Sequence, residues 1–360
     1  MGSSIIKKVA IMLLVMLALF TGILTGWYRL GFDLPVGEIF IHHGAIMTGS
    51  FLGTVILIER IVSMKRNWLF VFPVVNAGSV PFYYLGLEEV AFYCLIFGAS
   101  GLVLVFYLIC RVHEDLPHIM MWVGAFAWLV GNVFLVVFNG YAQSILWWMA
   151  FLLITISAER LELNRFLPVS QRVKYLLVGS LFLFVLGCWL PFHFPGKYLI
   201  GISLLLSGIW LLNYDMVRKS IKKIGIHRYS AIVLIYGYIW LLFSGLAFLL
   251  EGTGWIPYDT LMHSFFLGFV FSMIMAHAPI ILPGVLGLSG SPYHFSLYVW
   301  ATLLQFTLLV RLLGGILEYP EWKQWGGLLN GVVIFCFLIN LLVILIVRRL
   351  PFRIHGVEGR

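Results

Sequence analysis

Charged residues are scarce in this sequence. They make up 11% of its 360 residues, against about 25% in a typical soluble domain, while hydrophobic residues make up 62%. The mean hydropathy is +1.02. Apolar runs long enough to cross a bilayer recur along the chain, without the strict alternation of membrane β-strands. The composition therefore excludes a soluble globular domain and predicts an all-α polytopic membrane protein in contact with the lipid bilayer.

Cysteine motifs are also missing. The four cysteines lie in apolar runs with no CxxC or Cys/His ligand spacing, so neither a disulfide framework nor a zinc site is expected. The net charge of +8 is typical of cytoplasmic loops in a membrane protein, so nucleic-acid binding is not expected either. No small-residue cleavage site follows the first apolar run, which is therefore interpreted as a membrane helix.

Twelve apolar segments predict twelve transmembrane helices in a single domain, residues 1–360. Placing the N-terminus in the cytoplasm leaves only four of the 23 lysines and arginines outside, namely Arg29, Lys197, Arg311 and Lys323. Both termini are then cytoplasmic, and the expected location is the cytoplasmic membrane of a bacterium or archaeon. The predicted segments are 8–28, 38–61, 67–86, 88–110, 117–138, 141–158, 174–192, 197–216, 229–250, 257–284, 294–316 and 326–348.

A short internal sequence similarity suggests a repeated structural unit. The second span ends in "LIERIVSMKRN" and the sixth in "ISAERLELNRF", with Glu59-Arg60 and Glu159-Arg160 four spans apart. Three pseudo-repeats of four helices would make spans 2, 6 and 10 equivalent. The alternative is that Glu-Arg pairs are simply common at cytoplasmic helix ends, where both side chains reach water.

Histidines occur where lipid-facing residues would be expected. The stretch "IFIHHGAIMTGSFLG" opens span 2 with His42 and His43, and His263 lies about two turns into span 10. Both spans run from outside to inside, so these imidazoles share one depth near the outer surface. Because haem iron takes two axial ligands on opposite faces, the geometry favours a haem held between two helices. Adjacent residues point about 100° apart, so either His42 or His43 could be the ligand.

Other residues fit or compete with this interpretation. Arg311 and Arg29 could bind the haem propionates, although Arg311 could instead pair with Glu318 or reach to the interface. Met47 follows His43 by four residues and could replace an imidazole, or simply fill apolar space. Small residues at four-residue spacing would admit either a flat group or a neighbouring helix. They are Ala45, Gly49 and Gly53 in span 2, and Ser264, Gly268, Ser272 and Ala276 in span 10.

A second site is predicted at the inner boundary. His277 follows His263 on nearly the same helix face, about 21 Å deeper, at the depth of Glu59 and Glu159. Together they could form a proton entry or a second ligand site. Alternatively, His277 caps backbone groups freed by Pro279 and Pro283.

The histidines of spans 2 and 10 on a twelve-span plan resemble the catalytic subunit of haem–copper oxidases. In that superfamily these histidines bind the low-spin haem and arginines near the outer end of span 11 hold its propionates, which implies His43 or His42, His263 and Arg311 here. The stretches "HHGAIMTGSFLGTVILIER" and "MHSFFLGFVFSMIMAHAPIILP" are closer to NnrS-type haem-and-copper membrane proteins, associated with nitric oxide. Spans 6 and 7 contain no histidine, so the copper–haem dinuclear centre of the oxidases should be absent.

The resulting hypothesis is a haem-b membrane protein that transfers electrons or handles nitric oxide at the outer leaflet. Copper is a further candidate cofactor, and an electron-donor protein or a quinol a candidate partner. The alternatives are a cofactor-free twelve-helix transporter and an assembly or scaffold subunit. The scarcity of buried carboxylates argues against the transporter, because coupled transport usually needs an intramembrane acid.

Overall fold

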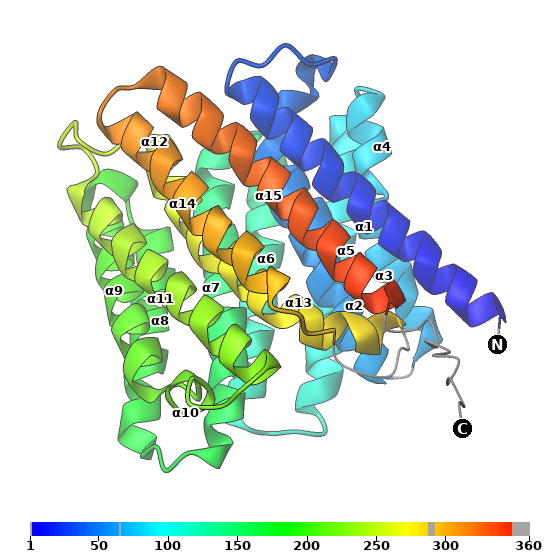
Figure 1. Cartoon of the computed structure of the whole chain (residues 1–360), viewed down its shortest axis with the longest axis vertical. Helices are drawn as coiled ribbons and strands as arrows, with labels where there is room; N and C mark the ends of the chain where they lie inside the picture. The colour runs from blue at the N-terminus through cyan, green and yellow to red at the C-terminus, as the bar shows by residue number, and fades with distance from the viewer. Residues whose placement is uncertain (1, 65, 287–291, 348–360) are drawn as a thin grey trace, which may run out of the picture.

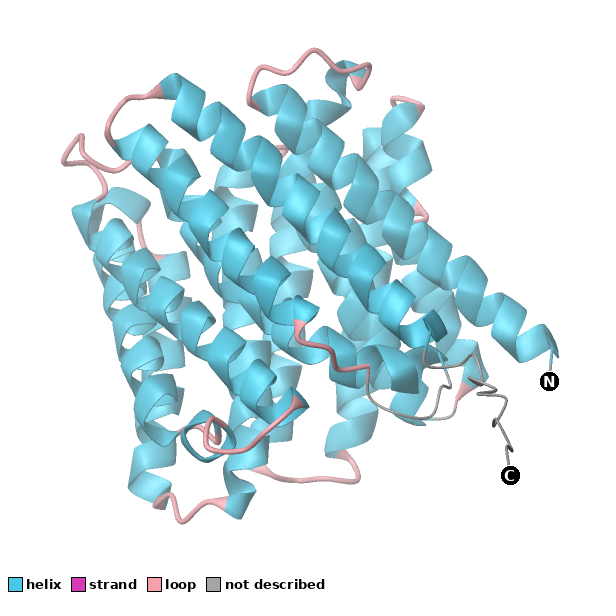
Figure 2. Ribbon diagram, viewed as in Figure 1, coloured by secondary structure: helices cyan, strands magenta, loops and turns pink. Residues whose placement is uncertain are grey.

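Helices account for all the regular structure in the described part of the chain. The computed structural model describes residues 2–64, 66–286 and 292–347, so the predicted cytoplasmic C-terminus lies outside the described residues. Its long helices run side by side as a tilted bundle with mostly short connections (Figures 1 and 2). Eleven helical segments among the described residues are long and apolar enough to cross a membrane, which confirms an all-α, multi-pass architecture.

The elements follow the predicted spans closely. The α-helices are α1 (Gly2–Arg29), α2 (Thr54–Met64), α3 (Val71–Ala77), α4 (Ser79–Tyr84), α5 (Glu88–Cys110), α6 (Leu116–Phe138), α7 (Tyr141–Leu163), α8 (Gln171–Trp189), α9 (Lys197–Tyr214), α10 (Val217–Ser220), α11 (Ile226–Leu250), α12 (Tyr258–His263), α13 (Phe271–Leu286), α14 (Ser296–Ile316) and α15 (Pro320–Val347). The 3₁₀ and π segments are η1 (Gly37–His42), η2 (Ala45–Gly53), η3 (Asn67–Phe70), η4 (Asn164–Phe166), η5 (Phe192–Gly196) and η6 (Ser264–Val270).

The expected span 67–86 is not a continuous helix. It forms η3, α3 and α4, with a break at Gly78 between Pro73 and Pro81. Proline has no N–H to donate to the preceding turn, which explains the interruption. The Asn76 amide donates to Gly49 O and to Thr54 Oγ1, both at 2.8 Å, and so joins the broken segment to its neighbour. The count of twelve spans therefore stays a prediction.

Three membrane-length segments are the most buried of the eleven: Ala45–Met64, Tyr141–Phe166 and Tyr258–Val285, with 67%, 72% and 61% of their apolar windows inside the protein. They are spans 2, 6 and 10 of the sequence-based numbering. The first and last helices, α1 and α15, lie side by side, and α1 packs on the first of the three, at η2 (Figure 1). The three-repeat plan stays a prediction, but its three proposed equivalents form the interior of the bundle.

Candidate cofactor cavity

A cavity of about 700 Å³ opens between α1, the start of η2, α7, α12, η6, α14 and α15. It lies toward the end of the bundle that the positive-inside rule places outside, here termed the outer end. Figure 1 shows α12 at this end and the N-terminus at the other. Five of the residues predicted from the sequence line the cavity: Arg29, His43, Met47, His263 and Arg311. Residues from spans far apart in sequence thus meet in one space.

His43 and His263 face each other within it. Their ring centres are 6.4 Å apart, with the ring planes inclined by 38°. Two metal–imidazole bonds of about 2.0–2.1 Å, with half a ring at each end, span about 6 Å. The separation is therefore close to that of two imidazoles that share one metal ion.

Backbone carbonyls orient both rings. His43 Nδ1 lies 2.9 Å from Gly22 O, and His263 Nδ1 lies 3.0 Å from Asp259 O. A carbonyl oxygen only accepts, so Nδ1 must carry the proton in each ring. In a neutral imidazole this leaves the lone pair on Nε2, the arrangement usual in metal-binding histidines.

Local sequence explains how these rings fit. A Cβ on Gly26 of α1 would lie 3.0 Å from His43 Cε1, so this glycine makes room for the imidazole. Both histidines also lie just before π-helical segments, because η2 begins at Ala45, two residues after His43, and η6 begins at Ser264, directly after His263. Such segments are frequent at functional sites.

Arg311 does not pair with Glu318 but with Asp259, through Nε–Oδ2 and Nη2–Oδ1 contacts of 3.0 and 2.7 Å. Its Nη2 also lies 3.2 Å from His263 Nε2. Asp259 was missed in the sequence analysis, although its position four residues before His263 places both on one helix face.

The cavity wall is strongly cationic. Arg29, Arg311 and Lys323 line it, whereas Asp259 is the one acidic residue among the described lining residues. The wall also contains Trp27, whose indole N–H is buried with no hydrogen-bond partner among the described residues. These donors would suit a ligand with anionic oxygens on an otherwise apolar body.

His42 points elsewhere. Its Nδ1 lies 2.7 Å from the Tyr141 hydroxyl and its Nε2 lies 3.1 Å from Glu88, while its ring stacks on Tyr83. His42 is not among the residues that line the cavity. Of the two adjacent histidines, the structure therefore brings only His43 to His263.

The small-residue stripes serve helix packing. A Cβ on Gly49 would lie 2.8 Å from Leu95, and one on Gly53 would lie 2.1 Å from Trp128. These glycines are not among the lining residues, which instead include Gly26, Gly44, Gly327 and Gly331. Met47 lines the cavity, and its sulfur packs so closely on Gly22 that a Cβ there would come within 2.2 Å.

The predicted inner residues belong to ion-pair networks. Glu159 pairs with Arg60, whose Nη2 also lies 3.6 Å from Glu59. His277 Nε2 lies 3.2 Å from Arg160 Nη1. Arg160 in turn forms a two-nitrogen contact with Asp215, at 3.1 and 2.9 Å to Oδ2.

The Tyr238 hydroxyl donates to the same Asp215 carboxylate at 2.7 Å. This buried network, comprising Arg160, Asp215, Tyr238 and His277, is termed the inner cluster. His277 Nδ1 lies 2.7 Å from Met273 O, which is not one of the carbonyls freed by Pro279 and Pro283. All four side chains have polar partners within the protein.

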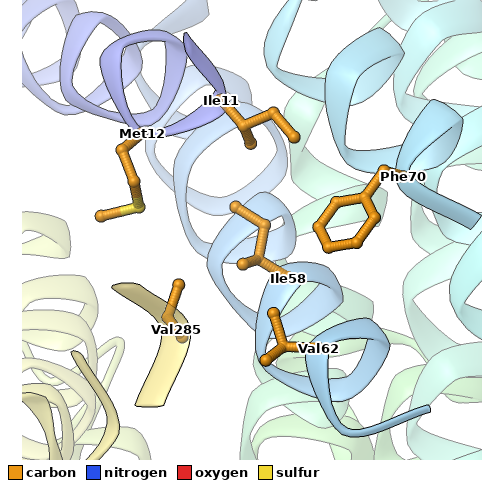
Figure 3. A pocket seen from close by; sticks show the side chains of 6 residues that line it. All are labelled: Ile11, Met12, Ile58, Val62, Phe70 and Val285. Atoms are coloured by element: carbon orange, nitrogen blue, oxygen red, sulfur yellow. The ribbon is translucent and has the colours of Figure 1, made fainter. Parts of the chain in front are cut away.

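A second hollow near the inner ends of α1, α2 and α13 has a volume of only about 10 Å³. Its six lining side chains are apolar and include Ile11, Ile58 and Val285 (Figure 3). That volume holds at most one water molecule and offers no polar partner, so it carries no site.

The described residues contain no group of three or more His, Cys, Asp or Glu side chains placed to hold a metal ion. A bare structural metal usually needs about four protein ligands, so two imidazoles suit a group that brings its own equatorial ligands.

The family model described as Domain of unknown function (DUF8744) matches residues 8–346. No curated protein and no solved structure matches the chain.

Proposed function

Since the chain belongs to the family described as Domain of unknown function (DUF8744), we propose its function from the cavity itself: it binds haem b between His43 and His263. The single observation that carries the proposal is the 6.4 Å separation of two rings whose Nδ1 atoms lie at hydrogen-bond distance from backbone carbonyls. Both rings come from different spans, as two axial ligands on opposite faces require.

The rest of the cavity fits the same group. A volume of about 700 Å³ lies within the range of cofactor pockets. Four glycines, Gly26, Gly44, Gly327 and Gly331, are among its lining residues and add no side-chain bulk to the wall. Two propionates would be neutralised by the cationic side chains of Arg29 and Lys323, and the unpartnered Trp27 N–H would donate a hydrogen bond to one of them. The apolar residues of the wall would keep water from the iron.

Within this site each residue has a defined task. In this proposal His43 and His263 bind through Nε2, and Gly22 O and Asp259 hold the rings in place. Binding at His263 requires Arg311 Nη2, which lies 3.2 Å from that nitrogen, to move aside. A bound haem supplies one-electron redox chemistry and, wherever an axial position is open, an affinity for diatomic gases. We therefore propose electron transfer or nitric oxide handling at the outer leaflet, in line with the resemblance to NnrS-type proteins. Because spans 6 and 7 lack histidine, the proposal includes no copper–haem dinuclear centre.

The test is the reduced-minus-oxidised absorption spectrum of the purified protein, expressed with an ample haem supply. Haem b bands at about one haem per chain are expected, with loss of most of the haem in His43→Ala and His263→Ala because each removes one of the two axial ligands. His193→Ala is the matched control, because this exposed imidazole lies outside the cavity. His42→Ala should also keep its haem. A colourless wild-type protein would refute the proposal, and loss of haem only in His42→Ala would reassign the ligand.

A further inference from the structure

Asp259 links the candidate iron ligand His263 to Arg311. We infer that Asp259 is a positioning residue that fixes the His263 ring and makes it the more strongly donating of the two axial ligands. The inference rests on the proposed haem site. Asp259 has no described contact with His43, so it would act on a bound haem only through His263.

Two oxygens of Asp259 surround His263 Nδ1. The backbone oxygen lies 3.0 Å away and the carboxylate Oδ1 lies 3.1 Å away. Both residues belong to the short helix α12, and their four-residue spacing places them on the same helix face. The Nδ1–H of His263 therefore meets a charged acceptor as well as the carbonyl.

Arg311 fixes the carboxylate itself. Its Nε and Nη2 approach the two carboxylate oxygens at 3.0 and 2.7 Å, a fork that sets the plane of the carboxylate. Arg311 is on α14, a different helix, and its side chain is only 9% exposed. Asp259 is therefore held from both sides, and its Oδ1 stays directed at the imidazole.

His43 has no such acceptor. Its Nδ1 is 2.9 Å from Gly22 O and 3.2 Å from the Thr25 hydroxyl, both of which are neutral. A carboxylate acceptor raises the electron density and basicity of the ligating nitrogen more than a neutral acceptor does. The two axial imidazoles are therefore unequal, and His263 should favour the oxidised, more positively charged iron.

The experiment compares wild-type protein with Asp259→Asn by redox titration and by low-temperature electron paramagnetic resonance of the ferric haem. Asp259→Asn should raise the midpoint potential and change the ferric g-values while most of the haem remains bound. Glu318→Gln, which removes an exposed outer carboxylate with no described contact to either histidine, should match the wild type in both readouts. An Asp259→Asn protein that matches the wild type in both readouts would overturn the inference.

Asp259→Glu keeps the carboxylate and decides the question if Asp259→Asn loses its haem. Asp259→Glu should retain haem, and its midpoint potential should lie close to that of the wild type. Loss of haem in both variants, with normal folding by circular dichroism, would show a purely structural role and overturn the inference. A wild-type protein without haem would instead refute the proposed function, so the two failures are distinguishable.

Discussion

The buried contact of Arg160 with Asp215 offers a test of the fold that needs no cofactor. Asp215 is 1% exposed and Arg160 is 5% exposed. The carboxylate accepts from Arg160 and from the Tyr238 hydroxyl, as described for the inner cluster. In Asp215→Asn the shape of the side chain is retained but its charge is lost, which leaves the Arg160 guanidinium buried without a counter-charge.

Breaking one partner of a buried ion pair costs about 3–5 kcal/mol. At about 2–4 °C per kcal/mol, the slope for domains of about 150–250 residues, the melting temperature should fall by roughly 6–20 °C. The assay is thermal unfolding of the detergent-solubilised protein, followed by circular dichroism or tryptophan fluorescence. Asp115→Asn is the matched control, because Asp115 pairs with His118 at an exposed helix start and its loss should cost about 1 kcal/mol or less.

Replacing both partners separates charge from packing. The double variant Arg160→Met with Asp215→Asn removes both charges together, and should recover most of the lost stability because no unpaired charge remains. The reasoning is refuted if Asp215→Asn melts within a degree or two of Asp115→Asn. It is also refuted if the double variant is less stable than the single one.

Two glycine substitutions test the packing on either side of the site. Gly26→Val should lower haem content several-fold in purified protein, because even a Cβ would lie 3.0 Å from His43 Cε1; Gly179→Val, at a position with open space, should keep its haem. Gly53→Ala should destabilise the protein by about 1–3 kcal/mol in thermal melts, because its Cβ would lie 2.1 Å from the Trp128 ring. Gly179→Ala is the control and should melt at or above the wild-type temperature, and equal melting of the two variants would contradict the packing argument.

The fold class could be predicted because hydrophobic length alone encodes a membrane helix. Eleven of the twelve predicted segments overlap membrane-length apolar helices among the described residues. The segment 67–86 was predicted as one helix because its hydropathy is high, although Pro73 and Pro81 were visible in the sequence. Hydropathy measures transfer to lipid and is insensitive to a break whose free backbone groups are satisfied locally, as the Ser79 hydroxyl does by donating to Asn76 O at 2.6 Å.

The cavity could be predicted in part because depth follows from position along a helix. Counting residues placed His43 and His263 at one depth, and the structure brings them to 6.4 Å. That they bind haem stays a prediction. The choice between His42 and His43 could not be made, because it depends on rotation about the helix axis and a π-helical segment follows both residues.

Rotation also explains why the sequence left open whether the small-residue stripes face a bound group or a neighbouring helix. Residues four apart share a face in an α-helix but drift in a π-helix, and η2 spans Ala45, Gly49 and Gly53. Asp259 was within reach of the sequence analysis, because an acid four residues before a candidate ligand is a common orienting pattern. Its contact with Arg311 of α14 was not, since tertiary pairing leaves no trace in a single sequence.

The π-helical segments η2 and η6 separate the two ends of the helices that contain them. On one side of each segment lies a cavity histidine, and on the other side lie residues of the inner ion-pair networks, Glu59 after η2 and His277 after η6. The direction in which the imidazole points about the helix axis is therefore set separately from that of the deeper turns. Loss of one residue from either segment would change the winding between the histidine and the deeper turns, and would so rotate the histidine about the helix axis relative to them. Substitutions in the outer part of these spans can therefore alter the cavity and its ligand while the inner ion-pair networks keep their geometry.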